Sequence, residues 1–112
     1  MTMTQSAMSQ PGTGGEPACR IWIEAQPEGA SLRITVRAWS EQTARLDYEL
    51  LSEKRDGTNR SRSRQAGGVT LESGKSRILS SIKLDKLPTA HYTFSAKLYR
   101  DGIPVAGQET EY

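Results

Sequence analysis

Hydrophobic and polar residues alternate along most of the chain after its first 18 residues. The stretch CRIWIEAQ sends Ile21 and Ile23 to one face, and SLRITVRAW does the same with Leu32, Ile34 and Val36. A period of two residues is typical of a β-strand that has one face in a core and the other in water. Both stretches therefore predict half-buried strands, and the PEGA sequence between them predicts a tight turn.

The alternation continues downstream in ARLDYELLSE, which directs Leu46, Tyr48 and Leu50 to one face. The Asp56-Gly57 pair that follows favours a hairpin turn, because these residues accept the positive φ angles that such a turn requires. The next stretch, NRSRSRQ, predicts a strand with no apolar face at all. It is polar or charged at every position.

The apolar alternation resumes in VTLESGKSRILSSIKLD, which predicts one short piece, a kink at Ser73-Gly74 and then a strand with Ile78, Ile82 and Leu84 inward. HYTFSAKLY and IPVAGQETEY predict the last two strands, with an Asp-Gly turn between them. The inward positions expected in HYTFSAKLY are Tyr92, Phe94, Ala96 and Leu98.

Seven predicted strands, separated by turn signals about every eight to twelve residues, favour an immunoglobulin-like antiparallel β-sandwich. No window has the apolar spacing of an amphipathic helix. Tyr92 follows Leu87 and Pro88 at the start of the sixth strand, where a tyrosine corner bonds back to the preceding turn. Tyr92 as a plain core aromatic is the alternative. The cysteine pair and the third-strand tryptophan of antibody domains are missing, so the subtype stays open.

The first 18 residues, MTMTQSAMSQPGTGGEPA, contain no aromatic residue and no Val, Ile or Leu. Such a segment cannot bury enough apolar surface to offset the entropy cost of ordering it. We therefore expect residues 1–18 to form a disordered tail and residues 19–112 to form one immunoglobulin-like domain. A chain of 112 residues fits a single domain of this size.

No apolar run approaches the length of about 18 residues that a membrane span needs, and no secretory signal pattern is present. We expect no membrane insertion. The protein is then either cytosolic, or secreted with its signal peptide already removed. Cys19 is the only cysteine, which leaves no intramolecular disulfide, CxxC redox pair or cysteine zinc site.

The sequence offers little catalytic chemistry. His91 is the only histidine, and it falls on the polar side of its strand with no nucleophile-elbow motif elsewhere. No GxGxxG follows a strand and no Walker A motif occurs, so we expect no cofactor. One His and one Cys are too few donors to predict a metal site. We expect the protein not to be an enzyme.

The most distinctive feature is the arginine triplet Arg60, Arg62 and Arg64 at two-residue spacing. In an extended strand these side chains project the same way, with about 6.6 Å between neighbours. Together with Lys54 and Arg55 they form what we call the basic surface, which is the candidate partner-binding site.

Three interpretations of the basic surface compete. A row of like charges on a strand at the margin of a sheet prevents edge-to-edge aggregation. A basic tract can also bind nucleic acid, although a net charge of only +2 and just two outward aromatic candidates, Trp22 and Trp39, disfavour this. The third interpretation is contact with a protein partner.

The order of these segments resembles a known family. The stretch LDYELLSEKRDGTNRSRSRQAGG, followed by LESGKSRILSSIKL and preceded by the strand IWIEAQPEG, is similar to the small periplasmic curli-assembly chaperones of the CsgC/CsgH group, and most similar to the CsgH branch. The resemblance extends over most of residues 19–112. CsgC-type members can carry a Cys-x-Cys pair where this chain has Ala44-Arg45-Leu46, so no redox role carries over.

The resemblance implies a periplasmic immunoglobulin-like protein that keeps an amyloidogenic, CsgA-like curli subunit soluble before export. On this reading the basic surface contacts the client transiently. Positive charge would raise the encounter rate with an acidic client and would repel further copies of the chaperone. We expect a monomer, because no apolar patch is evident at outward positions beyond Trp22, Trp39 and Leu51. An immunoglobulin-like structural or adhesion accessory domain is the alternative, followed by a nucleic-acid-binding module.

Overall fold

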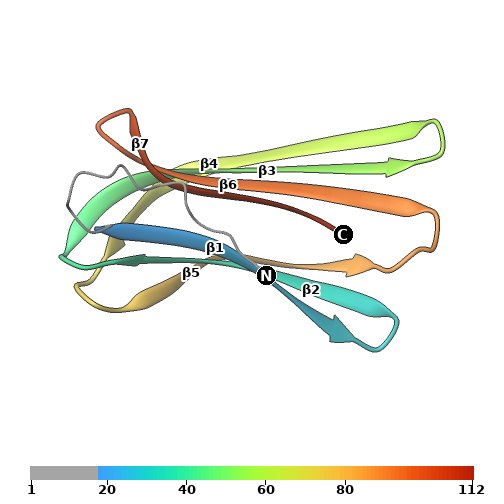
Figure 1. Ribbon diagram of the computed structural model, residues 1–112, viewed down its shortest axis with the longest axis horizontal. Helices are drawn as coiled ribbons and strands as arrows, with labels where there is room; N and C mark the ends of the chain where they lie inside the picture. The colour runs from blue at the N-terminus through green and yellow to red at the C-terminus, as the bar shows by residue number, and fades with distance from the viewer. Residues whose placement is uncertain (1–17) are drawn as a thin grey trace.

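The computed structural model describes residues 18–112, which form seven antiparallel strands and no helix (Figure 1). Three strands form one sheet in the order β1-β2-β5, and four form the other in the order β4-β3-β6-β7. The prediction of an all-β sandwich of seven strands is confirmed. The predicted disordered tail lies outside the described residues, except for Ala18. The strands are β1 (Cys19–Glu28), β2 (Ser31–Ser40), β3 (Ala44–Asp56), β4 (Asn59–Leu71), β5 (Ser76–Asp85), β6 (Ala90–Arg100) and β7 (Ile103–Glu111).

The core lies between the inner faces of the two sheets. Its largest fully buried apolar side chains are Ile34 on β2, Leu46 on β3, Leu71 on β4 and Leu98 on β6. They come from both sheets, so the sheets cannot separate without exposing apolar surface to water. The inward alternation predicted for β2, β3 and β6 is therefore confirmed. No helix within residues 18–112 is long and apolar enough to cross a membrane.

Strand β4 joins two segments that the sequence analysis keeps apart. The polar NRSRSRQ stretch and the short VTL piece form one continuous strand that pairs with β3 along its whole length. Residues 59–66 are exposed, whereas Val69 and Leu71 are buried. VTL is thus the core-facing end of β4 and not a separate piece before β5. Because β4 pairs with β3, the domain differs from the constant-type immunoglobulin arrangement, in which the fourth strand joins the other sheet.

The inward position predicted for Ile78 on β5 is wrong. Its side chain is 50% exposed, because the pairing of β2 with β5 shifts register between Val36 and Arg37. A β-bulge inserts one extra residue, here Leu79, and side chains before the bulge change faces. Ile78 therefore lies opposite Arg37 on the outer face of the sheet.

Ile82 keeps the predicted inward parity, because it lies opposite the fully buried Ile34. Its side chain is nevertheless 39% exposed. The reason is its position: β5 is the last strand of its sheet, so fewer side chains of the other sheet cover its inner face.

The tyrosine corner predicted at Tyr92 is confirmed. The Tyr92 hydroxyl donates a hydrogen bond to the backbone carbonyl oxygen of Asp85 over 2.9 Å, and its ring is buried and stacks with Phe94. This bond fixes the end of β5 against the start of β6, where the chain crosses from one sheet to the other.

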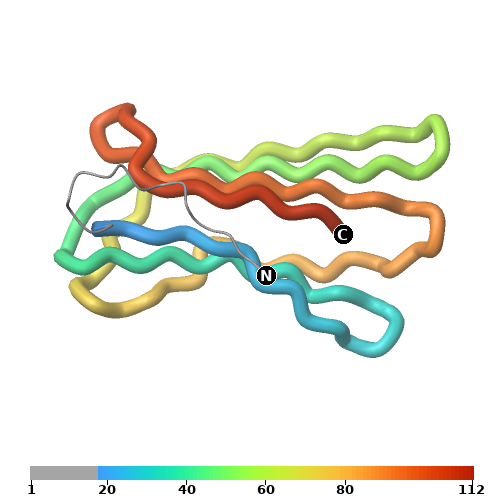
Figure 2. Tube along the Cα trace, in the orientation of Figure 1, coloured from blue at the N-terminus to red at the C-terminus, as the bar shows by residue number. Residues whose placement is uncertain are grey.

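The two long sides of the sandwich differ. On one side β1 and β7 lie together, and the Ile23 amide donates to Gln108 Oε1 over 2.6 Å. On the other side β4 and β5 are joined by a short connection, and next to it Arg77 Nη1 donates a hydrogen bond to the Thr70 carbonyl oxygen over 3.0 Å. Beyond it they diverge towards the end that carries the β3–β4 turn (Figure 2). We call this β4–β5 side the open side.

Candidate interaction surface

The β3–β4 hairpin displays the three arginines of the basic surface. Gly57 has a φ of 65° in the hairpin turn, which glycine adopts without steric cost. The side chains of Arg60, Arg62 and Arg64 lie on the outer face of the four-stranded sheet and are 52, 71 and 64% exposed. The expected outward row of guanidinium groups on an extended strand is therefore present.

Two carboxylates on the neighbouring strand β3 face this row. Arg62 Nε donates to Glu53 Oε2 over 2.9 Å, and Arg60 Nε lies 3.5 Å from the same oxygen. Arg64 Nε donates to Glu49 Oε2 over 2.8 Å. The row is thus an ordered ladder of ion pairs across two strands and not a set of isolated cations.

The arginines hold both carboxylates in the charged form. The hydrogen bond from Arg62, followed by the charges of Arg60 and Arg62, lowers the pKa of Glu53 below its ordinary value. The hydrogen bond from Arg64 lowers the pKa of Glu49 in the same way. At neutral pH the two carboxylates therefore cancel part of the positive field.

The structure separates one member of the basic surface from the rest. Arg55 lies opposite Arg60 on the outer face and is exposed. Lys54 lies opposite Ser61 and Tyr92, and its side chain points towards the inner face on the open side. With Arg45 and Asp47 further along β3, five guanidinium groups and three carboxylates share the outer face of the hairpin, which leaves an excess of two positive charges there.

The sequence analysis missed the acidic partners, Glu49 and Glu53. The signal for Glu53 was present, because counting outwards from the Asp56-Gly57 turn pairs it with Arg62. Glu49 lies opposite Ala66 and reaches Arg64 diagonally. That contact depends on side-chain reach, which strand register alone does not give.

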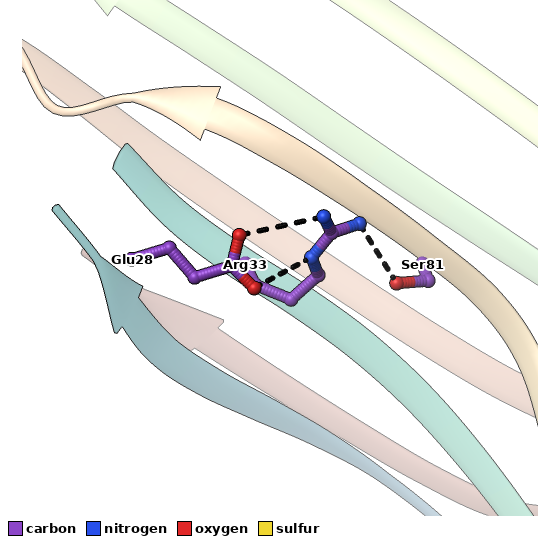
Figure 3. Close-up of polar contacts among 3 residues, drawn as sticks. All are labelled: Glu28, Arg33 and Ser81. Atoms are coloured by element: carbon purple, nitrogen blue, oxygen red, sulfur yellow. Dashed lines mark hydrogen bonds and ion pairs between the residues drawn. The ribbon is translucent and has the colours of Figure 1, made fainter. Parts of the chain in front are cut away.

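Ion pairs also link the strands on the outer face of the three-stranded sheet. Arg33 on β2 spans the sheet: Nε donates to Glu28 Oε2 over 3.1 Å and Nη1 donates to Ser81 Oγ over 3.3 Å (Figure 3). It links β1, β2 and β5 on that face. This ladder belongs to the opposite side of the molecule and does not extend the basic surface.

Aromatic rings occupy the other end of the same face. Trp22 and Trp39 are half-buried on it, as expected for outward positions. The Arg20 guanidinium stacks 5.4 Å from the centre of the Trp39 ring, and Trp22 Nε1 donates to Glu24 over 2.9 Å. The outer faces of the two sheets therefore differ: the four-stranded sheet carries the ion-pair ladder of the β3–β4 hairpin, whereas both tryptophans lie on the three-stranded sheet.

The structure also shows where the histidine and the cysteine of the chain lie. His91 is exposed opposite Arg55, as its position in the alternation predicts. Cys19 is buried, with Sγ 3.9 Å from Ser40 Oγ. Within residues 18–112, no group of three or more His, Cys, Asp or Glu side chains is arranged to hold a metal ion.

Comparison with known proteins gives matches of structure only. No protein-family model and no curated protein matches the sequence. The E. coli curli protein CsgC superposes with a TM-score of 0.70 and 14% sequence identity, covering 81% of this chain and 96% of CsgC. CsgH from R. palustris superposes with a TM-score of 0.64 and 16% identity, covering 81% of this chain and 91% of CsgH.

A different kind of match shows how widely such sandwiches are used. A glycosyl hydrolase family 2 member from Bacteroides cellulosilyticus superposes with a TM-score of 0.53 and 11% identity, but the match covers only 15% of that protein. One fold can serve several functions. The similarity to CsgC and CsgH therefore shows that this chain has their fold, over nearly their full length.

Proposed function

We propose that this protein is a curli accessory protein of the CsgC/CsgH kind that acts outside the cytoplasm. The observation that carries the proposal is the match to CsgC and CsgH across 96 and 91% of their chains. The resemblance of the hairpin segments in the sequence points the same way. A match over most of the length of CsgC and CsgH is a better guide to function than the match to one part of the glycosyl hydrolase, because a shared fold alone does not imply a shared function.

In this proposal the protein keeps a CsgA-like curli subunit soluble, and the basic surface makes the first contact. Amyloid grows by adding strands to a backbone ladder, so a soluble protein that meets the monomer early delays productive stacking. An excess of positive charge raises the encounter rate with an acidic client. Contacts of this kind are weak, which suits a client that must later be released.

The ion-pair ladder supports this role through the geometry of the guanidinium group. Arg62 and Arg64 use Nε to reach their carboxylates. A guanidinium has five N–H donors, so each retains donors for carboxylate or amide oxygens of a client. Glu49 and Glu53 hold the arginines in an ordered row, which reduces the side-chain entropy lost on contact.

The test is fibrillation of a CsgA-like subunit with substoichiometric amounts of this protein. We expect the wild type to lengthen the lag time. A variant with Arg60, Arg62 and Arg64 all changed to Ser should lose most of that effect. The matched control changes three exposed cations elsewhere to Ser: Lys75, Lys86 and Arg100. Both variants have the same net charge, so only the position of the charge differs.

Two results would count against the proposal. A wild-type protein that leaves the lag time unchanged would remove the chaperone function. Equal lag times for the two triple variants would remove the basic surface from the mechanism while leaving the function in place.

Protection of the sheet margin is a second role for the same arginines, and the topology favours it. β4 is the last strand of its sheet, which is where charge prevents edge-to-edge association. If protection is the whole role, the Arg60, Arg62 and Arg64 to Ser variant will self-associate in sedimentation experiments and will still delay fibrillation by the curli subunit.

A further inference from the structure

The sandwich has four strand margins, and three of them are protected. β1 and β7 lie against each other and share the hydrogen bond from Ile23 to Gln108. β4 carries its row of arginines. The margin of β5 presents Ile82, which is 39% exposed, next to the half-buried Leu84.

Residues 80–85 form the regular part of this margin. They pair with β2 without interruption, from Ser80 opposite Val36 to Asp85 opposite Ser31, and the bulge lies before them. β5 is the last strand of its sheet, so backbone groups that point away from β2 face the open side. An unpaired margin of this kind is a template for another strand.

The segment is also held in an extended conformation. Arg33 fixes Ser81 on the outer face, as Figure 3 shows, and Tyr92 holds the carbonyl oxygen of Asp85 at the far end. Neither contact involves a neighbouring strand on the open side. A margin that is already straight loses little entropy when a partner strand pairs with it.

The charges around the open side indicate the chemistry of that strand. Lys54 points into it from β3, Lys83 lies on β5 itself, and the arginines of β4 border it on the far side. Two carboxylates also lie near it: Asp56 at the end of β3 accepts a hydrogen bond from Thr89 Oγ1 over 2.8 Å, and Asp85 is the last residue of β5. The cations remain in excess, because Glu49 and Glu53 on the outer face of the β3–β4 hairpin are paired with arginines. A strand with acidic or amide side chains therefore fits better than a basic one.

We propose that residues 80–85 of β5 form a strand-addition site for an extended client segment in which apolar residues alternate with acidic or amide residues. The apolar side chains of the client would cover Ile82 and Leu84, and its backbone would pair with the free margin. The proposal rests on the proposed function and deepens it: the arginines attract the client, and β5 binds its backbone.

The test replaces Ile82 by Lys. A lysine on the inner face of a marginal strand opposes strand addition, yet it adds positive charge and so favours electrostatic attraction. The two mechanisms therefore predict opposite effects. The matched control is Ile103→Lys, because Ile103 is 65% exposed on β7 and receives the same change.

We expect the Ile82→Lys protein to lose most of the lag extension with a CsgA-like subunit, whereas the Ile103→Lys protein keeps it. Equal activity of the two variants would overturn strand addition and leave the proposed function intact. A wild-type protein without any effect would overturn the proposed function instead. Thermal unfolding of both variants confirms that they are folded.

A second measurement uses the wild-type protein, so it does not depend on a variant that folds. Backbone amide shifts are followed by NMR while a soluble peptide that covers one strand of the CsgA-like subunit is added. Strand addition predicts that the largest shifts fall in residues 80–85. Shifts confined to residues 53–64 of the β3–β4 hairpin would overturn it.

Discussion

The two margins of the open side, β4 and β5, are both edge strands with unpaired backbone groups, but their side chains differ. β4 presents eight consecutive exposed residues, including three arginines, and its buried side chains are Val69 and Leu71 near its end. β5 carries apolar side chains along most of its length, with a bulge near its start. The arginines of β4 disfavour pairing with another strand by charge repulsion, whereas β5 has only the bulge near its start to disfavour such pairing. The two proposals use this difference: in them the charged margin attracts a client, and the β5 margin pairs with it.

The largest expected effect separates the two ends of β4. Leu71 is fully buried, so Leu71→Ala should lower the free energy of unfolding by about 2–5 kcal/mol through lost burial and a cavity. Ser63→Ala on the exposed end of the same strand should change it by less than about 0.5 kcal/mol. Urea denaturation measures both. Similar values for the two variants would contradict the division of β4 into a core end and a solvent end.

The next effect concerns the anchor of β5. Tyr92→Phe removes the hydroxyl that bonds to the Asp85 carbonyl oxygen and should cost about 1–2 kcal/mol, because a partly buried acceptor loses its partner. Amide exchange near residues 80–85 should also become faster. If exchange there is unchanged while global stability falls, the corner stabilises the core but does not hold the β5 margin.

A smaller effect sharpens the charge difference between the margins. Glu53→Gln removes a carboxylate that pairs with two arginines and leaves the outer face of the hairpin more positive. Exposed ion pairs contribute little to stability, so the unfolding midpoint should barely move. Association with an acidic client should become faster and more sensitive to salt. Stopped-flow association rates at several salt concentrations measure this, and an unchanged salt dependence would argue against electrostatic steering.

The smallest effect is the dependence of stability on pH. The pKa values of Glu49 and Glu53 are lower in the folded state than their ordinary value of 4.5. Their contribution is therefore fully present above that value and is lost as the pH falls through the lowered pKa values. The urea midpoint should fall slightly more steeply between about pH 6 and about pH 3 in the wild type than in a Glu49→Gln, Glu53→Gln variant. Glu24 and Glu28 on the other sheet titrate in both proteins, so the difference isolates the hairpin.

Much of this molecule could be predicted from local sequence. The two-residue period determines the strands, and the Asp-Gly pairs at 56–57 and 101–102 mark two of the turns between them. The two-residue spacing of Arg60, Arg62 and Arg64 places all three side chains on one face of their strand. The position of Tyr92 after Leu87 and Pro88 suggested a corner bond, with a plain core aromatic as the alternative, and the structure contains the bond. These features depend on a few neighbouring residues and on backbone geometry, so they can be derived from one chain.

The rest was decided by pairing between distant strands. The bulge that turns Ile78 outward arises where β5 meets β2, more than thirty residues earlier in the chain. Leu71 is buried, whereas Ser63 and Gln65, which share its inward parity, are exposed, because the second sheet covers only one end of β4. The sequence by itself determined which residues alternate and which are charged. Only the tertiary structure decided which edge strands are covered and which carboxylates face the arginines. Both depend on how strands far apart in the sequence pair and pack, and the local sequence of one strand does not specify its neighbours.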